Sequence, residues 1–134
     1  MYLFDTDTIS NLLKKRPSLT LLRKLAGLSA QEQFTSSITV GELIYCAYRS
    51  TRTDYFLQKL DEPVWPNINI VPFDEAAARI YGQLRAKLER TGTTLSEPDL
   101  RIASIALFSQ LTLITGNIRH FSKVPDLRLE NWLQ

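Results

Sequence analysis

Three acidic residues stand where an apolar segment meets a predicted helix, and they are the strongest candidates for chemistry in this sequence. Asp5 ends the apolar run 1–4, and Glu42 and Asp99 lie near the starts of two later helices. In an open parallel sheet the carboxyl ends of the strands line one crevice, and ligands bind there. Acids that converge in such a crevice repel one another unless a hard divalent cation neutralises them. The pattern therefore predicts a site for Mg²⁺ or Mn²⁺.

Helix capping is the competing explanation for each acid taken singly. An acid in the first turn of a helix accepts hydrogen bonds from free backbone N–H groups and complements the helix dipole. Asp74, between a predicted strand and a predicted helix, is interpreted as a cap and nothing more. The other capping candidates are the capping-box pattern of Thr39 with Glu42, the similar pattern of Ser96 with Asp99, and Asp5 or Thr6 before the first helix.

The surroundings of the three acids favour a shared role. Asp5 ends a strand that should be central, because crossovers can build outwards on both sides of it. Glu42 lies in an otherwise apolar stretch and is expected to be half-buried, while Asp99 opens a strongly apolar helix. Buried carboxylates are rarely left unpaired. Arg101, the nearest cation to Asp99, should point to a different part of its helix, so a metal ion is the better partner.

The elements that must position these acids alternate along the chain. Alternation of strands and helices implies right-handed crossovers and a mostly parallel sheet with helices on both faces. Neither a dinucleotide-binding G-x-G-x-x-G motif nor a P-loop occurs, which argues against those two enzyme classes. The predicted strands cover residues 1–4, 33–37, 67–72, 111–114 and 127–129, and the predicted helices cover 7–14, 19–27, 39–48, 52–61, 75–90 and 98–110.

Composition sets the broad class of the protein. A chain of 134 residues suits one domain, and 44% hydrophobic with 22% charged residues is ordinary for a soluble globular protein. The N-terminus lacks the features of a secretory signal, and no apolar run reaches membrane-spanning length. The lone Cys46 is interpreted as a buried structural thiol, which fits a reducing cytosol. A net charge of +2 with scattered basic groups permits nucleic-acid binding without requiring it.

An ordered set of motifs resembles a known family. The motifs are Asp5-Thr6-Asp7, Thr39-x-x-Glu42-Leu43, Gly92-x6-Asp99-x2-Ile102-Ala103 and Leu113-Ile114-Thr115-Gly116-Asn117-x3-Phe121. In this order and at this length they resemble the PIN-domain ribonucleases, and within them the VapC toxins of toxin–antitoxin pairs. The resemblance implies a single PIN domain over 1–134, with a three-layer α/β/α sandwich around a central, mostly parallel five-stranded sheet.

The resemblance also implies roles for individual residues. Asp5, Glu42 and Asp99 correspond to the catalytic, metal-binding acids of the family, with Mg²⁺ or Mn²⁺ as cofactor. Asn117 stands where many PIN domains have a fourth acid, and Asp7 either restores that charge or sits in the first helical turn. Two hydroxyl residues, Thr6 and Thr115, are expected either to orient water or a carboxylate, or to act as cap or strand-end hydroxyls.

The implied function is that of a metal-dependent endoribonuclease acting as a toxin in the cytoplasm. Its substrate would be tRNA or rRNA, its partner a VapB-type antitoxin, and its own assembly a homodimer. The alternatives are a housekeeping PIN nuclease in RNA processing, a catalytically inactive PIN binding module and, less favoured, a metal-dependent phosphatase. The RNA-binding candidates beside the motifs are Arg101, Arg119 and Lys123, each of which is otherwise ordinary surface charge. An apolar stripe that either packs in the core or meets a partner comprises Leu12, Leu13, Tyr55 and Phe56.

Overall fold

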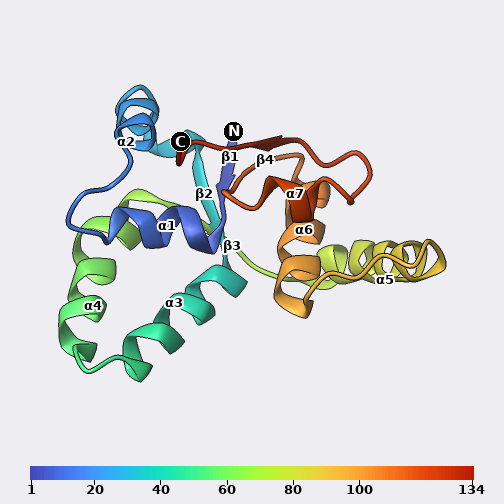
Figure 1. The fold of residues 1–134 in the computed structure, drawn as a ribbon, viewed down its shortest axis with the longest axis horizontal. Helices are drawn as coiled ribbons and strands as arrows, with labels where there is room; N and C mark the ends of the chain where they lie inside the picture. Colours follow the sequence, from blue (N-terminus) through green and yellow to red (C-terminus); the bar gives the residue numbers. More distant parts are fainter.

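Five short strands pair side by side in the order β3-β2-β1-β4-β5, and every pairing is parallel. The structure is a computed structural model that describes residues 1–134 (Figure 1). The central strand is β1, as the sequence predicts, so Asp5 stands at the middle of the carboxyl edge. The strands are β1 (Tyr2–Phe4), β2 (Gln33–Ser36), β3 (Asn69–Val71), β4 (Thr112–Ile114) and β5 (Leu129–Glu130).

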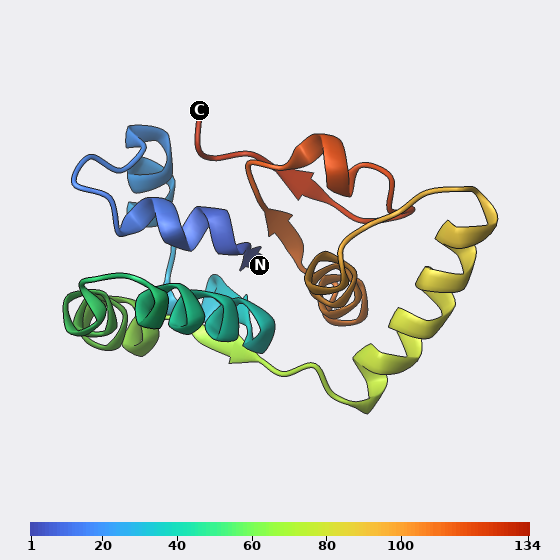
Figure 2. The same ribbon diagram turned by 60° about the horizontal axis from the view of Figure 1, so that its bottom comes forward.

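Helices cover both sides of this sheet, which confirms the three-layer α/β/α prediction. Figures 1 and 2 both show α1, α2 and α4 on one side of the strands, and α5 and α6 on the other. None of the helices has the length and apolar character needed to cross a lipid bilayer. The helices are α1 (Thr6–Leu12), α2 (Leu19–Ala26), α3 (Ser37–Arg49), α4 (Thr53–Lys59), α5 (Glu75–Arg90), α6 (Glu97–Ser109) and α7 (Ile118–Phe121), with short turns η1 (Ala30–Glu32), η2 (Leu60–Val64) and η3 (Trp65–Asn67).

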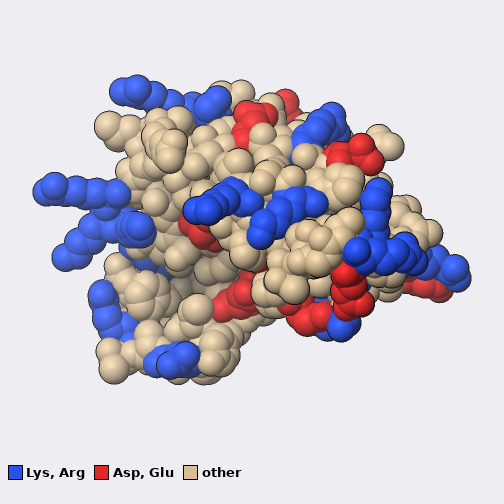
Figure 3. All heavy atoms as spheres, turned by 45° about the vertical axis from the view of Figure 1, so that its right-hand side comes forward, with Lys and Arg blue, Asp and Glu red and all other residues tan.

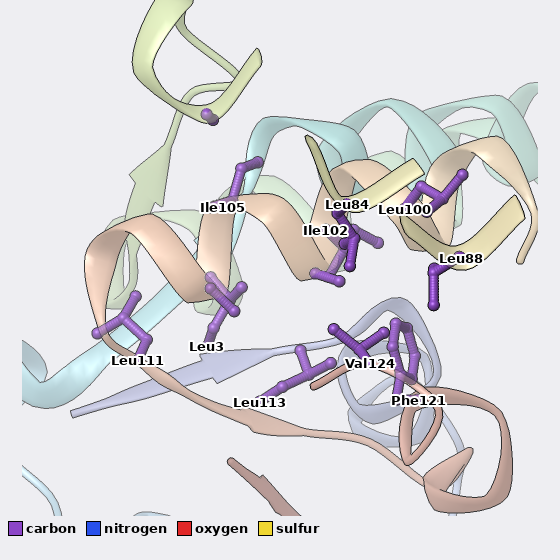
Figure 4. Close-up of a cluster of buried hydrophobic side chains, with 13 residues drawn as sticks. Leu3, Leu84, Leu88, Leu100, Ile102, Ile105, Leu111, Leu113, Phe121 and Val124 are labelled. Carbon is purple, nitrogen blue, oxygen red and sulfur yellow. The ribbon is translucent and has the colours of Figure 1, made fainter. Parts of the chain in front are cut away.

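The two faces of the sheet carry separate hydrophobic cores because side chains alternate along a strand. Leu3 of β1 and Leu113 of β4 point into a core of 13 buried residues shared with α5, α6 and α7. Figure 4 shows Leu3 and Leu113 lying among Ile102 of α6 and Phe121 of α7. The next residues along the same strands, Phe4 and Ile114, join a second core on the opposite face, together with Ile9, Leu21, Leu43, Leu60 and Trp132. The two cores pack against β1 and β4 from both sides. They therefore fix the ends of these strands, which Asp5 and Thr115 directly follow.

The start of α3 differs from the prediction. The helix begins at Ser37, and the hydroxyl of Ser36 caps it by accepting a hydrogen bond from the Thr39 N–H at 3.0 Å. The capping box of Thr39 with Glu42 is therefore wrong, and Glu42 lies in the second turn of the helix. The cap predicted at Asp74 is confirmed, since its carboxylate accepts from the Ala77 N–H at 3.0 Å.

Smaller differences occur where local patterns are weak. The α-helix α4 ends at Lys59, earlier than predicted, and Pro63 lies inside the π-helical turn η2 that follows. The last strand begins at Leu129, two residues later than predicted, because its register is set by pairing with Leu113 of β4. Cys46 is exposed, so its assignment as a buried thiol is wrong: it lies on the side of α3 that borders an open groove.

Candidate active site

Asp5 lies at the end of the central strand and is almost completely buried, with 5% of its surface exposed. Its Oδ1 accepts a hydrogen bond from the Thr6 N–H at 2.8 Å, which makes Asp5 the N-cap of α1. Its Oδ2 accepts a hydrogen bond from the Thr115 hydroxyl at 2.7 Å. The Thr115 oxygen in turn accepts from the Asn117 N–H at 3.0 Å. Asp5 is therefore a cap as well as a buried acid, held by neighbours from α1 and from the end of β4.

The electrostatic setting of Asp5 disfavours its charged form. Burial raises the pKa of Asp5 from 3.8 to about 7, and repulsion from Asp7 and Asp99 adds to the increase. The hydrogen bonds from Thr115 and Thr6 lower the pKa but do not outweigh burial. A positive charge next to Asp5 would reverse this balance. The raised pKa marks Asp5 as a functional-site candidate on physical grounds.

Asp99 lies in the first turn of α6 and is half-buried. Burial raises its pKa, and repulsion from Asp7 acts in the same direction, while the Ser96 hydroxyl and His120 lower it. Ser96 is the N-cap of α6, with its hydroxyl accepting from the Asp99 N–H at 3.4 Å. The carboxylate of Asp7 is near enough to repel those of both Asp5 and Asp99.

Glu42 is linked to the start of α1, next to Asp5, by hydrogen bonds that involve hydroxyl groups. The Thr6 hydroxyl donates to Glu42 Oε1 at 2.6 Å, and it lies 3.2 Å from the Thr39 hydroxyl. The Thr39 hydroxyl lies 3.2 Å from that of Ser36, and both residues are fully buried. The prediction that Glu42 is half-buried is confirmed. The sequence indicated Thr6 as a supporting hydroxyl but Thr39 only as a cap and motif residue, and it gave no signal for Ser36, because such hydroxyls resemble ordinary helix-cap residues.

Asp7 and Gly116 join α1 to the segment after β4. Asp7 Oδ2 accepts a hydrogen bond from the Gly116 N–H at 2.9 Å. A Cβ atom at position 116 would lie 2.9 Å from that oxygen and 2.9 Å from Leu133 Cδ1, so glycine is needed for this close approach. Asn117 is exposed directly after it, and its backbone carbonyl begins α7. Asp7 therefore lies close to the end of β4, next to the segment that contains Asn117.

The basic candidates differ in whether another side chain already partners their charge. Arg101 Nη2 lies 3.6 Å from Glu97 Oε2, and its guanidinium lies over the ring of Phe73, so its charge is already partnered. Arg119 in α7 and Lys123 just after it are exposed and form no ion pair. Figure 3 shows basic and acidic side chains interspersed over this face of the molecule. For His120 the sequence favours an exposed loop position over a role as general acid, but the residue is partly buried in α7 and close enough to Asp99 to lower its pKa.

The donor chemistry of the site fits a hard divalent cation. All candidate ligands are oxygen atoms, which Mg²⁺ and Mn²⁺ prefer. Burial and, to a smaller extent, repulsion from neighbouring carboxylates raise the pKa of Asp5 and of Asp99, and a bound cation would favour their charged forms. No three His, Cys, Asp or Glu side chains stand in metal-ligating arrangement in this structure. One carboxylate oxygen of Glu42 accepts a hydrogen bond from the Thr6 hydroxyl, and one of Asp7 accepts from the Gly116 N–H.

An open apolar groove of about 430 Å³ adjoins the acids. It runs between α1, α3 and α4, and Thr6, the hydroxyl partner of Glu42, lines it together with Leu13 and Phe56. Basic side chains of Lys14, Lys15 and Arg52 border it. The groove thus has an apolar surface and a basic rim, and it reaches the site through Thr6, which is hydrogen-bonded to Glu42.

Comparison with known proteins places this fold and site in a family. Residues 2–127 match the PIN domain family. The chain is 34% identical to "Ribonuclease VapC2" of Rickettsia felis, over 98% of each protein, and 32% identical to "tRNA(fMet)-specific endonuclease VapC" of Salmonella typhimurium, over 98% of this chain and 97% of the relative. The crystal structure of VapBC2 from Rickettsia felis bound to a promoter DNA fragment superposes with a TM-score of 0.90 at 32% identity, covering 98% of both chains. The chain therefore belongs to the PIN-domain family and, within it, to the VapC ribonucleases of toxin–antitoxin systems.

Proposed function

We propose that this protein is a divalent-metal-dependent endoribonuclease, the toxin of a toxin–antitoxin pair, and that Asp5, Asp99 and Glu42 form its catalytic centre. The observation that carries the proposal is the buried Asp5, whose pKa is raised to about 7 at the centre of the carboxyl edge. Burial of this carboxyl disfavours its charged form more than its hydrogen bonds from Thr6 and Thr115 favour it, so capping of α1 does not account for an acid in this place. Holding a cation against an anionic phosphodiester accounts for it.

Each group at the site has a part in this chemistry. Asp5 and Asp99 would hold Mg²⁺ or Mn²⁺, which when bound supplies Lewis-acid activation of the phosphate and of water. Glu42, held by the Thr6 hydroxyl, and Asp5 are the candidate acceptors for the proton of the attacking water. Thr115 keeps the Asp5 carboxylate oriented through its 2.7 Å hydrogen bond. Asp7 adds negative charge beside the two metal-binding acids. Asn117 supplies a neutral oxygen at the end of β4.

The test is cleavage of total cellular RNA by the purified protein with Mg²⁺ or Mn²⁺ and with EDTA. We expect discrete fragments that disappear with EDTA and fall by at least about a hundred-fold in Asp99→Asn, because electrostatic stabilisation at such a centre contributes several kcal/mol. Asp74→Asn is the matched control: it makes the same change in an acid at the start of a helix, and it should cleave normally. Equal activity of Asp99→Asn and the wild type would remove Asp99 from the site.

The groove beside the site supports an antitoxin partner. A segment with apolar side chains flanked by acidic ones would fit the apolar floor and the rim of Lys14, Lys15 and Arg52. Because Thr6 lines the groove and binds Glu42, such a segment would end close to the acids and block them. The Rickettsia felis structure named above is a VapBC complex. By analogy we assign a VapB-type antitoxin to this groove.

The remaining parts of the proposal concern substrate and assembly. We infer a structured cellular RNA as substrate, with tRNA first because a relative is named for tRNA(fMet). Arg119 and Lys123, exposed beside the site, are the proposed phosphate contacts. We also propose a homodimer that works in the cytoplasm. A housekeeping nuclease would cleave RNA without arresting growth, and an inactive binding module would not cleave RNA under any metal condition.

A further inference from the structure

Two tyrosines and an arginine on α3 form an exposed face that no part of the fold covers. Tyr45 is 60% exposed and Tyr48 66% exposed, and neither packs against either hydrophobic core. Arg49, also exposed, donates a hydrogen bond from Nη1 to the Tyr45 hydroxyl at 3.4 Å, and its Cζ lies 5.7 Å from the ring centroid. We call Tyr45, Tyr48 and Arg49 the α3 aromatic face.

This face is continuous with the candidate active site. Ile38, Glu42, Tyr45 and Arg49 follow one another at intervals of four, three and four residues, which places them on one stripe of the helix. At its inner end, Ile38 packs against the core that contains α6, and Glu42 is bonded to Thr6. Figure 1 shows α3 leading away from the strand ends toward α4. At a rise of 1.5 Å per residue, Tyr45 lies about 4.5 Å beyond Glu42 along the helix axis.

The chemistry of the face differs from that of the apolar groove on the other side of α3. The groove side carries Leu43 and Ala47, whereas the α3 aromatic face has two phenol rings and a guanidinium and no aliphatic side chain. Aromatic rings stack on unpaired nucleic-acid bases, and arginine complements the phosphate charge. Arg49 also supplies positive charge on the same stripe as Glu42, where the acids alone would repel a polyanion.

We propose that the α3 aromatic face binds unpaired bases of the RNA substrate beside the scissile phosphate, with Tyr45 and Tyr48 as stacking platforms and Arg49 on the backbone. This inference rests on the proposed ribonuclease function and adds the residues that would recognise the bases next to the cleaved bond. A paired helix keeps its bases stacked on one another and cannot offer them to tyrosine rings. The enzyme therefore selects sites where one or two bases next to the cleaved bond are free.

The test is binding of a fluorescein-labelled single-stranded oligoribonucleotide, and of the same strand annealed to its complement, to the full chain in EDTA. Tyr45→Ala and Tyr48→Ala are each expected to weaken single-strand binding by about five- to 150-fold, since stacking contributes ~1–3 kcal/mol per base. Tyr45→Phe should bind within about two-fold of the wild type, because the ring is kept. Arg49→Gln should make the affinity less dependent on salt.

The matched control is Phe108→Ala. Phe108 is also an exposed aromatic residue, 54% exposed, but it lies in the last turn of α6, near the opposite end of β4 from the site. Its removal should leave binding unchanged. Unchanged affinity in both tyrosine-to-alanine variants would overturn the inference. A change in oligomeric state without any loss of oligonucleotide affinity would also overturn it, by showing that the face joins two copies of the chain.

Cleavage of total RNA by the same preparations separates this inference from the function on which it rests. If the wild type cleaves RNA, and the tyrosine variants bind and cleave RNA as well as the wild type does, the inference is overturned but the ribonuclease function stands. An inactive wild type would contradict the ribonuclease function. The binding measurements, which need no catalysis, would then still decide whether the face is an RNA platform.

Discussion

Asp5 carries a carboxyl group in a place that disfavours its charge. It is buried at the end of the central strand, with two more acids near it, and only two hydrogen-bond donors offset these effects. A carboxylate paired with arginine would have a lowered pKa, so the raised value separates Asp5 from an ordinary structural ion pair. The cost of this arrangement to the metal-free protein is measurable.

The first prediction concerns pH and the stability of the metal-free protein. Because the pKa of Asp5 rises from 3.8 to about 7 on folding, the folded state holds a proton between those pH values that the unfolded chain has released. The free energy of unfolding therefore falls as the pH rises through this window. Asp5→Asn lacks this dependence, so relative to the wild type it should gain about 2–3 kcal/mol in unfolding free energy between pH 5 and pH 8.

Urea denaturation of both proteins at the two pH values, in EDTA, measures this difference. Asp74→Asn serves as a control for a general effect of removing one acid, because Asp74 is an exposed cap. If Asp5→Asn and the wild type respond equally to pH, Asp5 does not have a raised pKa, and the electrostatic description of the site is wrong.

At the scale of elements, two helices begin with acids that have different roles. Asp74 is the N-cap of α5, and its carboxylate accepts the Ala77 N–H. Asp99 lies three residues after the cap Ser96 of α6, and its half-buried carboxylate interacts with the Ser96 hydroxyl and is repelled by Asp7. Capping therefore explains Asp74, whereas Asp99 is not itself the cap of α6, and its raised pKa comes first from burial. Asp5 is the intermediate case, because it caps α1 with one oxygen and faces the site with the other.

The second prediction follows from this difference. Asp74→Ala should lower the free energy of unfolding by about 1 kcal/mol, the usual cost of losing a cap, and should leave RNA cleavage unchanged. Asp74→Asn, which can still cap, should lose only a fraction of that stability. Thermal unfolding and the RNA assay on the same samples measure both effects. Loss of cleavage in Asp74→Ala without unfolding would show that α5 contributes to the site.

The strand and helix pattern was predictable because it depends on neighbouring residues. The alternation of apolar runs and helical periods gave all five strands and six of the helices. The start of α3 was predicted wrongly because Ser36 and Thr39 match a cap equally well in sequence, and the end of β2 at Ser36, which its pairing in the sheet sets, decides between them. The four-residue α7 is too short to show a helical period.

At the scale of the whole molecule, the site depends on contacts that no local pattern contains. Thr115 meets Asp5 across 110 positions, and Thr6 meets Glu42 across 36. The sequence indicated the acids through their order and spacing, but not which hydroxyl holds which carboxylate. The groove between α1, α3 and α4 was equally hidden, although Leu13 and Phe56 were flagged as candidates for core or partner contacts.

The third prediction concerns this groove. Phe56→Arg puts a charge into its apolar wall, so it should weaken the complex with the co-expressed antitoxin by at least about thirty-fold, as expected for a buried anchor. RNA cleavage by the isolated variant should remain, because Phe56 makes no hydrogen bond to the acids or to the hydroxyl groups that hold them. Phe108→Arg, a similar change on an exposed surface, is the control. Co-purification of wild-type amounts of antitoxin with Phe56→Arg would place the partner elsewhere.

The most direct test of the whole account is metal-dependent stabilisation of the folded protein. If Asp5 and Asp99 hold a divalent cation, adding Mn²⁺ or Mg²⁺ to metal-free wild type should raise its unfolding temperature in proportion to the logarithm of metal concentration above Kd. The increase should disappear in Asp5→Asn and in Asp99→Asn, and it should persist in Asp74→Asn. Equal stabilisation of all four proteins, or none in the wild type, would contradict a metal centre at the end of the central strand.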